Sequence, residues 1–249
     1  MAIFDIFKKK QEPEAPEKVQ ENAAFVQKRR HQRYEVRPSD LCTLDIDGPD
    51  GGRFRLRNIS HFGCLTDELT QVNLEKVTLP AVARVNLAGR FQAVEITALS
   101  KRSGGFGVGF RHSSIEALQA MGELILPLHW GASVTFLGEH PSEKDPSLRR
   151  LKFRGEGQFD LIVECSASDD VQFVMGTFML SGGHYVSLIW DGKTLTTKKT
   201  VNVNDPSARM ADTATLDRHI VHMCAAACLG IKRAVTDNCA SLLCKLTQG

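Results

Sequence analysis

A succession of short strand-like segments between residues 34 and 110 constrains the fold of this chain more than any other feature. Residues 54–59 alternate apolar and polar side chains with a period of two, which is typical of a strand with one buried face. The same interpretation applies to further segments, at residues 34–36, 41–46, 83–99 and 106–110. A small antiparallel β-barrel is the natural closure for such a set of strands.

The glycines at residues 104–109 mark the entry to one of these strands. They precede and interleave apolar side chains, whereas a dinucleotide-binding glycine loop must follow a buried strand and open a helix directly. A hairpin followed by a tightly packed strand is therefore the better interpretation. Ser113 and Glu116 then have the spacing of a capping box, which predicts a helix that runs to about Leu126 and stops at Pro127.

The second half of the chain reads as a sheet followed by a long helix. After a polar loop at residues 140–147, the predicted strands are residues 148–153, 157–165, 171–180, 184–190 and 194–203, with a hairpin turn at 190–193. Asp212 or Thr213 can cap a helix to about Leu246, which would span on the order of 50 Å. Its continuous apolar stripe either covers the sheet, with a break near Gly230, or meets a partner or a second copy. The predicted fold class is mainly β with α: an antiparallel barrel followed by a β-rich α+β domain with a long C-terminal helix.

Two polar motifs with complementary chemistry stand at the start of the barrel segments. Arg29 and Arg33 are four residues apart, and Asn58, Ser60 and Gly63 form N-x-S-x-x-G about two dozen residues later. Guanidinium groups match phosphate oxygens with planar forks of donors and also lie flat on purine rings. Small amide and hydroxyl side chains around a glycine turn let a ligand approach closely. The pair of motifs therefore suits a phosphate-bearing ligand.

In this order the two motifs resemble the PilZ domain, the bacterial receptor module for the second messenger cyclic di-GMP. Arg29, Arg33, Asn58, Ser60 and Gly63 match its R-x-x-x-R and D/N-x-S-x-x-G signature, with Asn in place of Asp at the first position of the second motif. The resemblance implies a PilZ-like barrel over residues 28–128, with the arginines on guanine and phosphate and the second motif on the opposite wall. Arg30 would add a phosphate contact. Residues 129–249 resemble no family and form a separate predicted domain.

Other functional classes remain open at this stage. The formal net charge of +2 excludes a globally basic nucleic-acid binder, but Arg53, Arg55 and Arg57 share one face of a strand and form a local basic face. An RNA- or protein-interaction module could use that face without a small ligand, although few aromatic side chains accompany it. A degenerate PilZ adaptor is a third class. A receptor of this family implies a protein partner in motility, biofilm or exopolysaccharide control.

The cysteines and histidines favour neither a metal site nor catalysis. The seven cysteines include no C-x-x-C pair, so we expect reduced thiols in a cytoplasmic protein and buried, apolar roles. On a helix, His219 and His222 would share one face while Cys224 and Cys228 would share another, which argues against a common metal ion. No Ser-His-Asp spacing, H-E-x-x-H or Walker loop is present, so we expect no enzyme activity, metal or cofactor.

The first 27 residues read as a tail outside the barrel. Residues 1–10 combine four large apolar side chains with three lysines, in a stretch too short to cross a membrane. Either they make a weak membrane or partner contact, or they remain an unattached terminus. Residues 11–27 are rich in Glu, Pro, Lys and Gln, which predicts a flexible tether.

Overall fold

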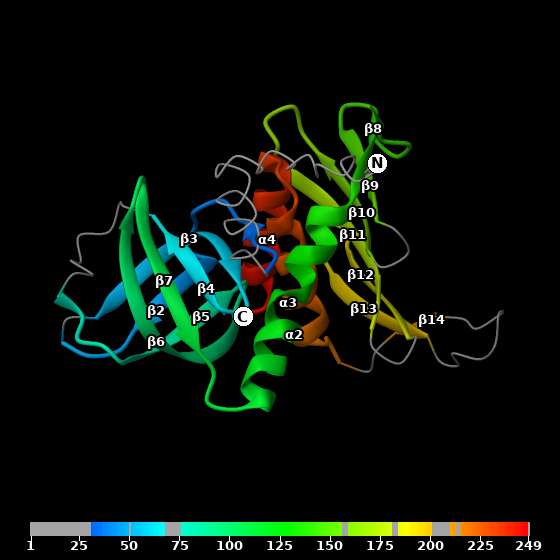
Figure 1. Ribbon diagram of the computed structural model, residues 1–249. Coiled ribbons are helices and arrows are strands. Elements are labelled where there is room, and N and C mark those ends of the chain that lie inside the picture. The colour runs from blue at the N-terminus through cyan, green and yellow to red at the C-terminus, as the bar shows by residue number, and fades with distance from the viewer. Residues whose placement is uncertain are drawn as a thin grey trace, which may run out of the picture. The chain divides into compact units, whose positions relative to one another are not determined.

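The computed structural model describes residues 31–49, 51–67, 76–155, 159–180, 184–200, 210–212 and 215–248 (Figure 1). The predictions for the tail at residues 1–27, for Arg29 and for Arg30 lie outside the described residues. The helices and strands given below belong to one compact unit that begins at Arg33. Its architecture confirms the predicted fold class, mainly β with α.

The first sheet of this unit closes into the predicted antiparallel barrel. Its strands are β1 (Tyr34–Glu35), β2 (Cys42–Ile46), β3 (Gly52–Ser60), β4 (Gly63–Thr66), β5 (Ala81–Leu87), β6 (Arg90–Arg102) and β7 (Gly105–Arg111). They follow the order β1, β3, β2, β5, β6, β7, β4, and β4 pairs again with β3 to complete a ring. The short strand β1 lies outside that ring, on the end of β3.

The alternation of side chains in the sequence explains how the barrel fills its interior. Phe54 and Leu56 are fully buried, whereas Arg53 and Arg55 between and beside them are exposed. A tight turn at Ala88 and Gly89, which have φ of 52° and 84°, divides the segment predicted at 83–99 into β5 and β6. The four-residue strand β4 was missed by the sequence analysis because it is too short to show a period.

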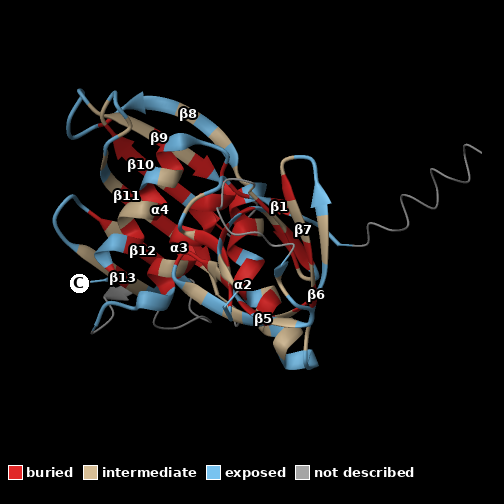
Figure 2. Cartoon of the chain, turned by 90° about the vertical axis from the view of Figure 1, so that its left-hand side faces the viewer, coloured by how far each residue is buried: buried red, intermediate tan, exposed pale blue. Residues whose placement is uncertain are grey.

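The second sheet is a meander in which each strand pairs with the next along the chain. Its strands are β8 (Thr135–Pro141), β9 (Arg149–Arg154), β10 (Phe159–Cys165), β11 (Val171–Met179), β12 (Tyr185–Trp190), β13 (Leu195–Thr200) and β14 (Met210–Asp212). The strands β8 and β14 were not predicted, and β8 takes up the start of the loop expected at 140–147. Buried residues, red in Figure 2, recur along the central strands β10, β11 and β12.

The helix after the barrel is longer than the sequence predicts. Helix α2 (Ile115–Ser133) begins at Ser114, whose hydroxyl accepts a hydrogen bond from the Ala117 amide, and it continues through Pro127. The predicted stop at Pro127 is therefore wrong. Burial of Leu128 and Trp130 in the following turn outweighs the loss of one backbone hydrogen bond at the proline. The predicted domain boundary at 128/129 falls inside this helix, and it stays a prediction.

The C-terminal helical segment consists of two helices, α3 (Arg218–Gly230) and α4 (Ala234–Leu246). The break near Gly230, one of the two alternatives drawn from the sequence, is the one observed. The side chain of Asp217 caps α3, so the predicted cap at Asp212 or Thr213 is wrong. All seven cysteines are free and buried, as expected. Within the described residues, no helix combines the length and the apolar character needed to cross a bilayer.

Helix α2 contacts both the barrel and the meander sheet. The ring of His129 meets Tyr34 of β1 edge-on at 5.8 Å, and the next residue, Trp130, packs on Phe178 of β11 at 5.5 Å. At the crossing of α2 with α3, a side chain on Gly131 would overlap the carbonyl oxygen of Ala227. The two helix backbones therefore approach more closely than any larger residue permits at that point.

We expect Gly131→Ala to destabilise the protein by about 1–3 kcal/mol, because the added methyl group forces the two helices apart. The same substitution inside an unobstructed helix is usually stabilising, by roughly 0.5–1 kcal/mol. Gly122→Ala in the same helix is the matched control, since its Cβ would meet only the movable His61 ring, at 3.3 Å. Urea unfolding of both variants checks the difference, and equal stability of the two would contradict a backbone-to-backbone crossing.

Candidate functional site

A β-bulge in β3 turns the second motif toward the outside of the barrel. The register of β3 against β4 shifts between Leu56 and Asn58, and Ile59 then resumes the buried series. Asn58 and Ser60, which flank Ile59, consequently lie on the outer side of the strand. Asn58 is half-buried at this position, whereas Ser60 and Gly63 are buried.

The antiparallel pairing of β1 with β3 brings the two motifs together. Tyr34 lies opposite Ile59 and Glu35 lies opposite Asn58, so the same register, extended by one residue, places Arg33 beside Ser60. Arg33 is exposed, and no hydrogen bond or ion pair holds it within the described residues. Its charge acts on the nearby Cys64 thiol and lowers the pKa of that group, although burial has the larger effect and raises the pKa overall.

The outward positions around Asn58 form one row across the barrel. In order, Glu35 of β1 pairs with Asn58 of β3, Asn58 with Leu65 of β4, Leu65 with Gly107 of β7, and Gly107 with Ser100 of β6. We call this set the outer row. The Oδ1 atom of Asn58 is buried and lacks a hydrogen-bond partner in the described structure. Buried acceptors without a partner are rare in folded proteins, so this atom calls for an explanation, and a ligand or an ordered water would supply the missing donor.

Ser60 and Gly63 also have structural roles in the hairpin that joins β3 to β4. The Ser60 hydroxyl donates a hydrogen bond to the Gly63 carbonyl at 3.0 Å, which leaves its lone pairs as acceptors. A side chain on Gly63 would overlap the Val108 carbonyl oxygen of the neighbouring strand β7. The packing of the barrel therefore requires glycine at this position whether or not a ligand binds there.

The basic face expected from Arg53, Arg55 and Arg57 is largely partnered within the protein. Arg53 donates two hydrogen bonds to Asp45, at 3.0 and 3.2 Å, and Arg55 donates one to Asp40 at 3.0 Å. Arg57 donates to the Gly104 carbonyl at 2.8 Å. Much of the positive charge along β3 is thus compensated by neighbouring acceptors.

The strand that follows Arg33 is tied directly to the C-terminal helices. Glu35 forms an ion pair with Lys232, which lies between α3 and α4, and this pair lowers the pKa of the Glu35 carboxyl. Arg37 forms a second ion pair, at 2.9 Å, with the half-buried Asp237 in the first turn of α4. Burial raises the pKa of Asp237 despite the opposing charge of Arg37. No sequence pattern predicts these contacts, because the paired residues are about 200 positions apart.

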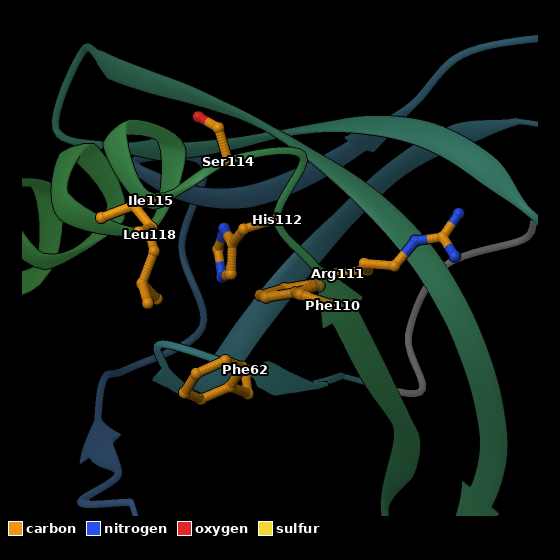
Figure 3. A pocket seen from close by; sticks show the side chains of 7 residues that line it. All are labelled: Phe62, Phe110, Arg111, His112, Ser114, Ile115 and Leu118. Atoms are coloured by element: carbon orange, nitrogen blue, oxygen red, sulfur yellow. The ribbon is translucent and has the colours of Figure 1, made fainter.

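A hollow of about 450 Å³ lies at the tip of the hairpin that joins β3 to β4 (Figure 3). Its walls are mainly apolar and include Phe62, which belongs to the turn between Ser60 and Gly63, and Ile115 at the start of α2. The Arg111 guanidinium points away from the other side chains that line it and is bound to Glu95. Neither Arg33 nor any residue of the outer row lines this hollow. The motif residues therefore lie outside it: Arg33 is exposed, Asn58 is half-buried, and Ser60 and Gly63 are buried.

The site offers binding chemistry. Its groups are a free guanidinium, an amide acceptor, a hydroxyl and a surface of small residues, which suit an anionic ligand with hydrogen-bond donors. In the described part of the chain, no cluster of three His, Cys, Asp or Glu side chains has the geometry to hold a metal ion. His219, His222, Cys224 and Cys228 belong to α3, where both thiols are buried.

Two substitutions should separate the structural and the binding roles of the motif residues. Arg33→Ala should change the free energy of unfolding by less than about 0.5 kcal/mol, because the side chain is exposed and unpartnered in the described structure. Gly63→Ala should cost about 1–3 kcal/mol, because the methyl group meets the backbone of β7. Thermal unfolding of the ligand-free variants measures both effects. A large loss from Arg33→Ala would contradict the position assigned to it.

Comparison with known proteins leaves this geometry as the basis for assigning a function. No family model matches the chain, and no curated protein or solved structure matches it either. A functional assignment therefore depends on the residues, the register and the charges described above.

Proposed function

We propose that the protein is a bacterial cyclic di-GMP receptor that binds its ligand on the outer surface of the barrel and passes the signal to its C-terminal region or to a protein partner. The observation that carries the proposal is the β1–β3 register, which places the last arginine of R-x-x-x-R beside Ser60 of N-x-S-x-x-G. The two motifs are about two dozen residues apart in sequence and would have no reason to meet in an arbitrary fold.

The chemistry of this surface fits the proposed ligand. A guanine base presents N–H donors on one edge, which suit the unpartnered Oδ1 of Asn58, and cyclic di-GMP carries two negatively charged phosphates. The exposed Arg33 can engage a phosphate or stack on a base. Arg29 and Arg30 precede it in sequence, and the resemblance implies that they add further cationic groups to the site. The proposed role is binding, without catalysis, metal or cofactor.

The main alternative, an RNA-interaction module on the basic face of β3, is less well supported. Its three arginines are bound to Asp45, to Asp40 and to the Gly104 carbonyl. An RNA backbone would have to compete with these partners, whereas Arg33 has none in the described structure. The charge pattern therefore favours a small anionic ligand near Arg33 over a polyanion along β3.

The contacts of β1 offer a route for the signal. A ligand that orders residues 29–33 would act on β1 and the residues just after it. Tyr34 contacts His129, Glu35 pairs with Lys232, and Arg37 pairs with Asp237. An exposed ion pair such as Glu35–Lys232 contributes little to stability, typically 0–1 kcal/mol, so ligand binding can shift these contacts at low cost. A ligand can move the equilibrium only by its differential affinity for the ordered state.

The purified protein should bind cyclic di-GMP with submillimolar or better affinity and prefer it to GMP and cyclic di-AMP. Arg33→Ala or Arg29→Ala should each weaken binding at least about tenfold, since a lost contact of about 1.4 kcal/mol already has that effect. Isothermal titration calorimetry measures the affinities. Absence of binding heat and of a thermal shift at high ligand concentration would refute the receptor proposal.

The double variant Arg53→Ala, Arg55→Ala provides the comparison with the RNA alternative. Under the receptor proposal it should bind cyclic di-GMP within about threefold of the parent protein, because both side chains are bound to carboxylates away from Arg33. An RNA-binding surface would lose affinity equally whether Arg29 and Arg33 or Arg53 and Arg55 are replaced. Its affinity for RNA would also fall steeply as the salt concentration rises. Equal effects of the two pairs would count against a specific site.

Hydrogen exchange tests the proposed route to the C-terminal helices. With cyclic di-GMP, protection should rise across about residues 27–36 and 57–64, and exchange should also change at 231–238, where Lys232 and Asp237 lie. Cyclic di-AMP serves as the control nucleotide. Protection confined to the two motifs, with 129–249 unaltered, would show that the signal does not pass through β1.

A further inference from the structure

Arg33 and Arg102 differ from every other described arginine between residues 33 and 134. The others bind a carboxylate or a backbone carbonyl: Arg37 (Asp237), Arg53 (Asp45), Arg55 (Asp40), Arg57 (Gly104), Arg84 (Asp47), Arg90 (Leu124) and Arg111 (Glu95). Arg33 and Arg102 have no hydrogen bond or ion pair to the residues that the structure describes. A guanidinium held at the surface without an internal acceptor is available to an external anion.

Arg102 lies over the far end of the outer row. In β7, Val108 and Phe110 point into the barrel and are buried. Successive residues of a strand point to opposite faces, so Gly107, the neighbour of Val108, faces outward. A Cβ atom built on Gly107 would lie 3.5 Å from Cγ and 3.6 Å from Nε of Arg102. The side chain of Arg102 therefore lies across the space that Gly107 leaves open, on the same outer surface as Asn58.

The outer row connects Arg102 to the proposed ligand site. From Asn58 the row passes through Leu65 to Gly107, which is a distance of two strand spacings, or about 10 Å. Arg33 lies at the β1 end of this surface, and Arg102 lies at its β6–β7 end. The intervening positions on β7 and β6 are the small residues Gly107, Gly109 and Ala98, while the larger Leu65 occupies the β4 position of the row.

We propose that Arg102 is a ligand-binding residue, which closes the site at the end opposite Arg33 and engages the second phosphate or second base of a dianionic dinucleotide. The stem of Arg102 lies beside Gly107, where an added Cβ atom would be in ordinary van der Waals contact with it. The inference rests on the proposed function and extends it. Within the described residues, two unpartnered guanidinium groups stand on opposite sides of the outer row, Arg33 two residues from Glu35 on β1 and Arg102 two residues from Ser100 on β6, and this separation favours a ligand with two separated anionic groups over a mononucleotide.

The test compares Arg102→Ala with Arg84→Ala in the full chain by calorimetric titration with cyclic di-GMP. Arg84 is the matched control, because it removes the same charge from an exposed barrel position where Asp47 is the partner. Arg102→Ala should weaken binding about tenfold or more, whereas Arg84→Ala should stay within about twofold. Arg102→Lys should weaken binding at least about threefold, because an ammonium group lacks the planar fork. All variants should unfold at the parent temperature to within about 2 °C.

The possible outcomes distinguish this inference from the proposal on which it rests. If the parent protein does not bind cyclic di-GMP, the proposed function fails, and the inference fails with it. If the parent binds and Arg33→Ala weakens binding while Arg102→Ala does not, the inference alone is overturned. It is also overturned if Arg84→Ala is as harmful as Arg102→Ala, because the effect would then be one of total charge. Loss of discrimination between cyclic di-GMP and GMP in Arg102→Ala would support the assignment of a second anionic contact.

Discussion

The barrel and the proposed binding surface both depend on the pairing of strand β3 (Gly52–Ser60) with three other strands. One edge of β3 pairs with β2 and, further along, with β1, while its other edge pairs with β4. The pairing with β4 completes the ring and leaves the barrel without an open edge at that point. The bulge between Leu56 and Asn58 lies in the same strand, so one irregularity in the ladder both sustains closure and turns Asn58 and Ser60 outward.

Close backbone contacts recur where the structure joins its parts. Gly63 is fitted against the Val108 carbonyl at the closing strand, and Gly131 against the Ala227 carbonyl where α2 crosses α3. In both places a methyl group would meet backbone, which cannot move aside as the end of a flexible side chain can. Because α2 also packs on Tyr34 and on Phe178, the helix carries contacts from the barrel to the meander sheet through a tightly packed crossing.

The distribution of charge on the outer surface of the barrel underlies the proposed selectivity. Most barrel arginines are bound to acceptors within the protein, and surface pairs of this kind neutralise charge while contributing little stability. The two exceptions among the described residues, Arg33 and Arg102, lie on opposite sides of the outer row, next to its β1 end and its β6 end. In this arrangement the positions of unpaired guanidinium groups, rather than the net charge of the chain, determine which anion the surface suits.

Much of the barrel was predictable because its information is local. A period of two places Phe54 and Leu56 in the core. In the second sheet, the turn at Trp190-Asp191-Gly192 is equally local, because its hydrogen bonds lie within four residues. The chemistry of Asn58, Ser60 and Gly63 was equally visible as a motif. Long-range packing, in contrast, explains why α2 continues past Pro127. It also explains why the C-terminal helix is divided: a short connection lets α3 and α4 both cover the sheet. The sequence alone determined which residues could bind an anion; only the tertiary structure decided that Arg33, Asn58 and Arg102 share one surface, because strand register and the β3 bulge depend on partners that are far away along the chain.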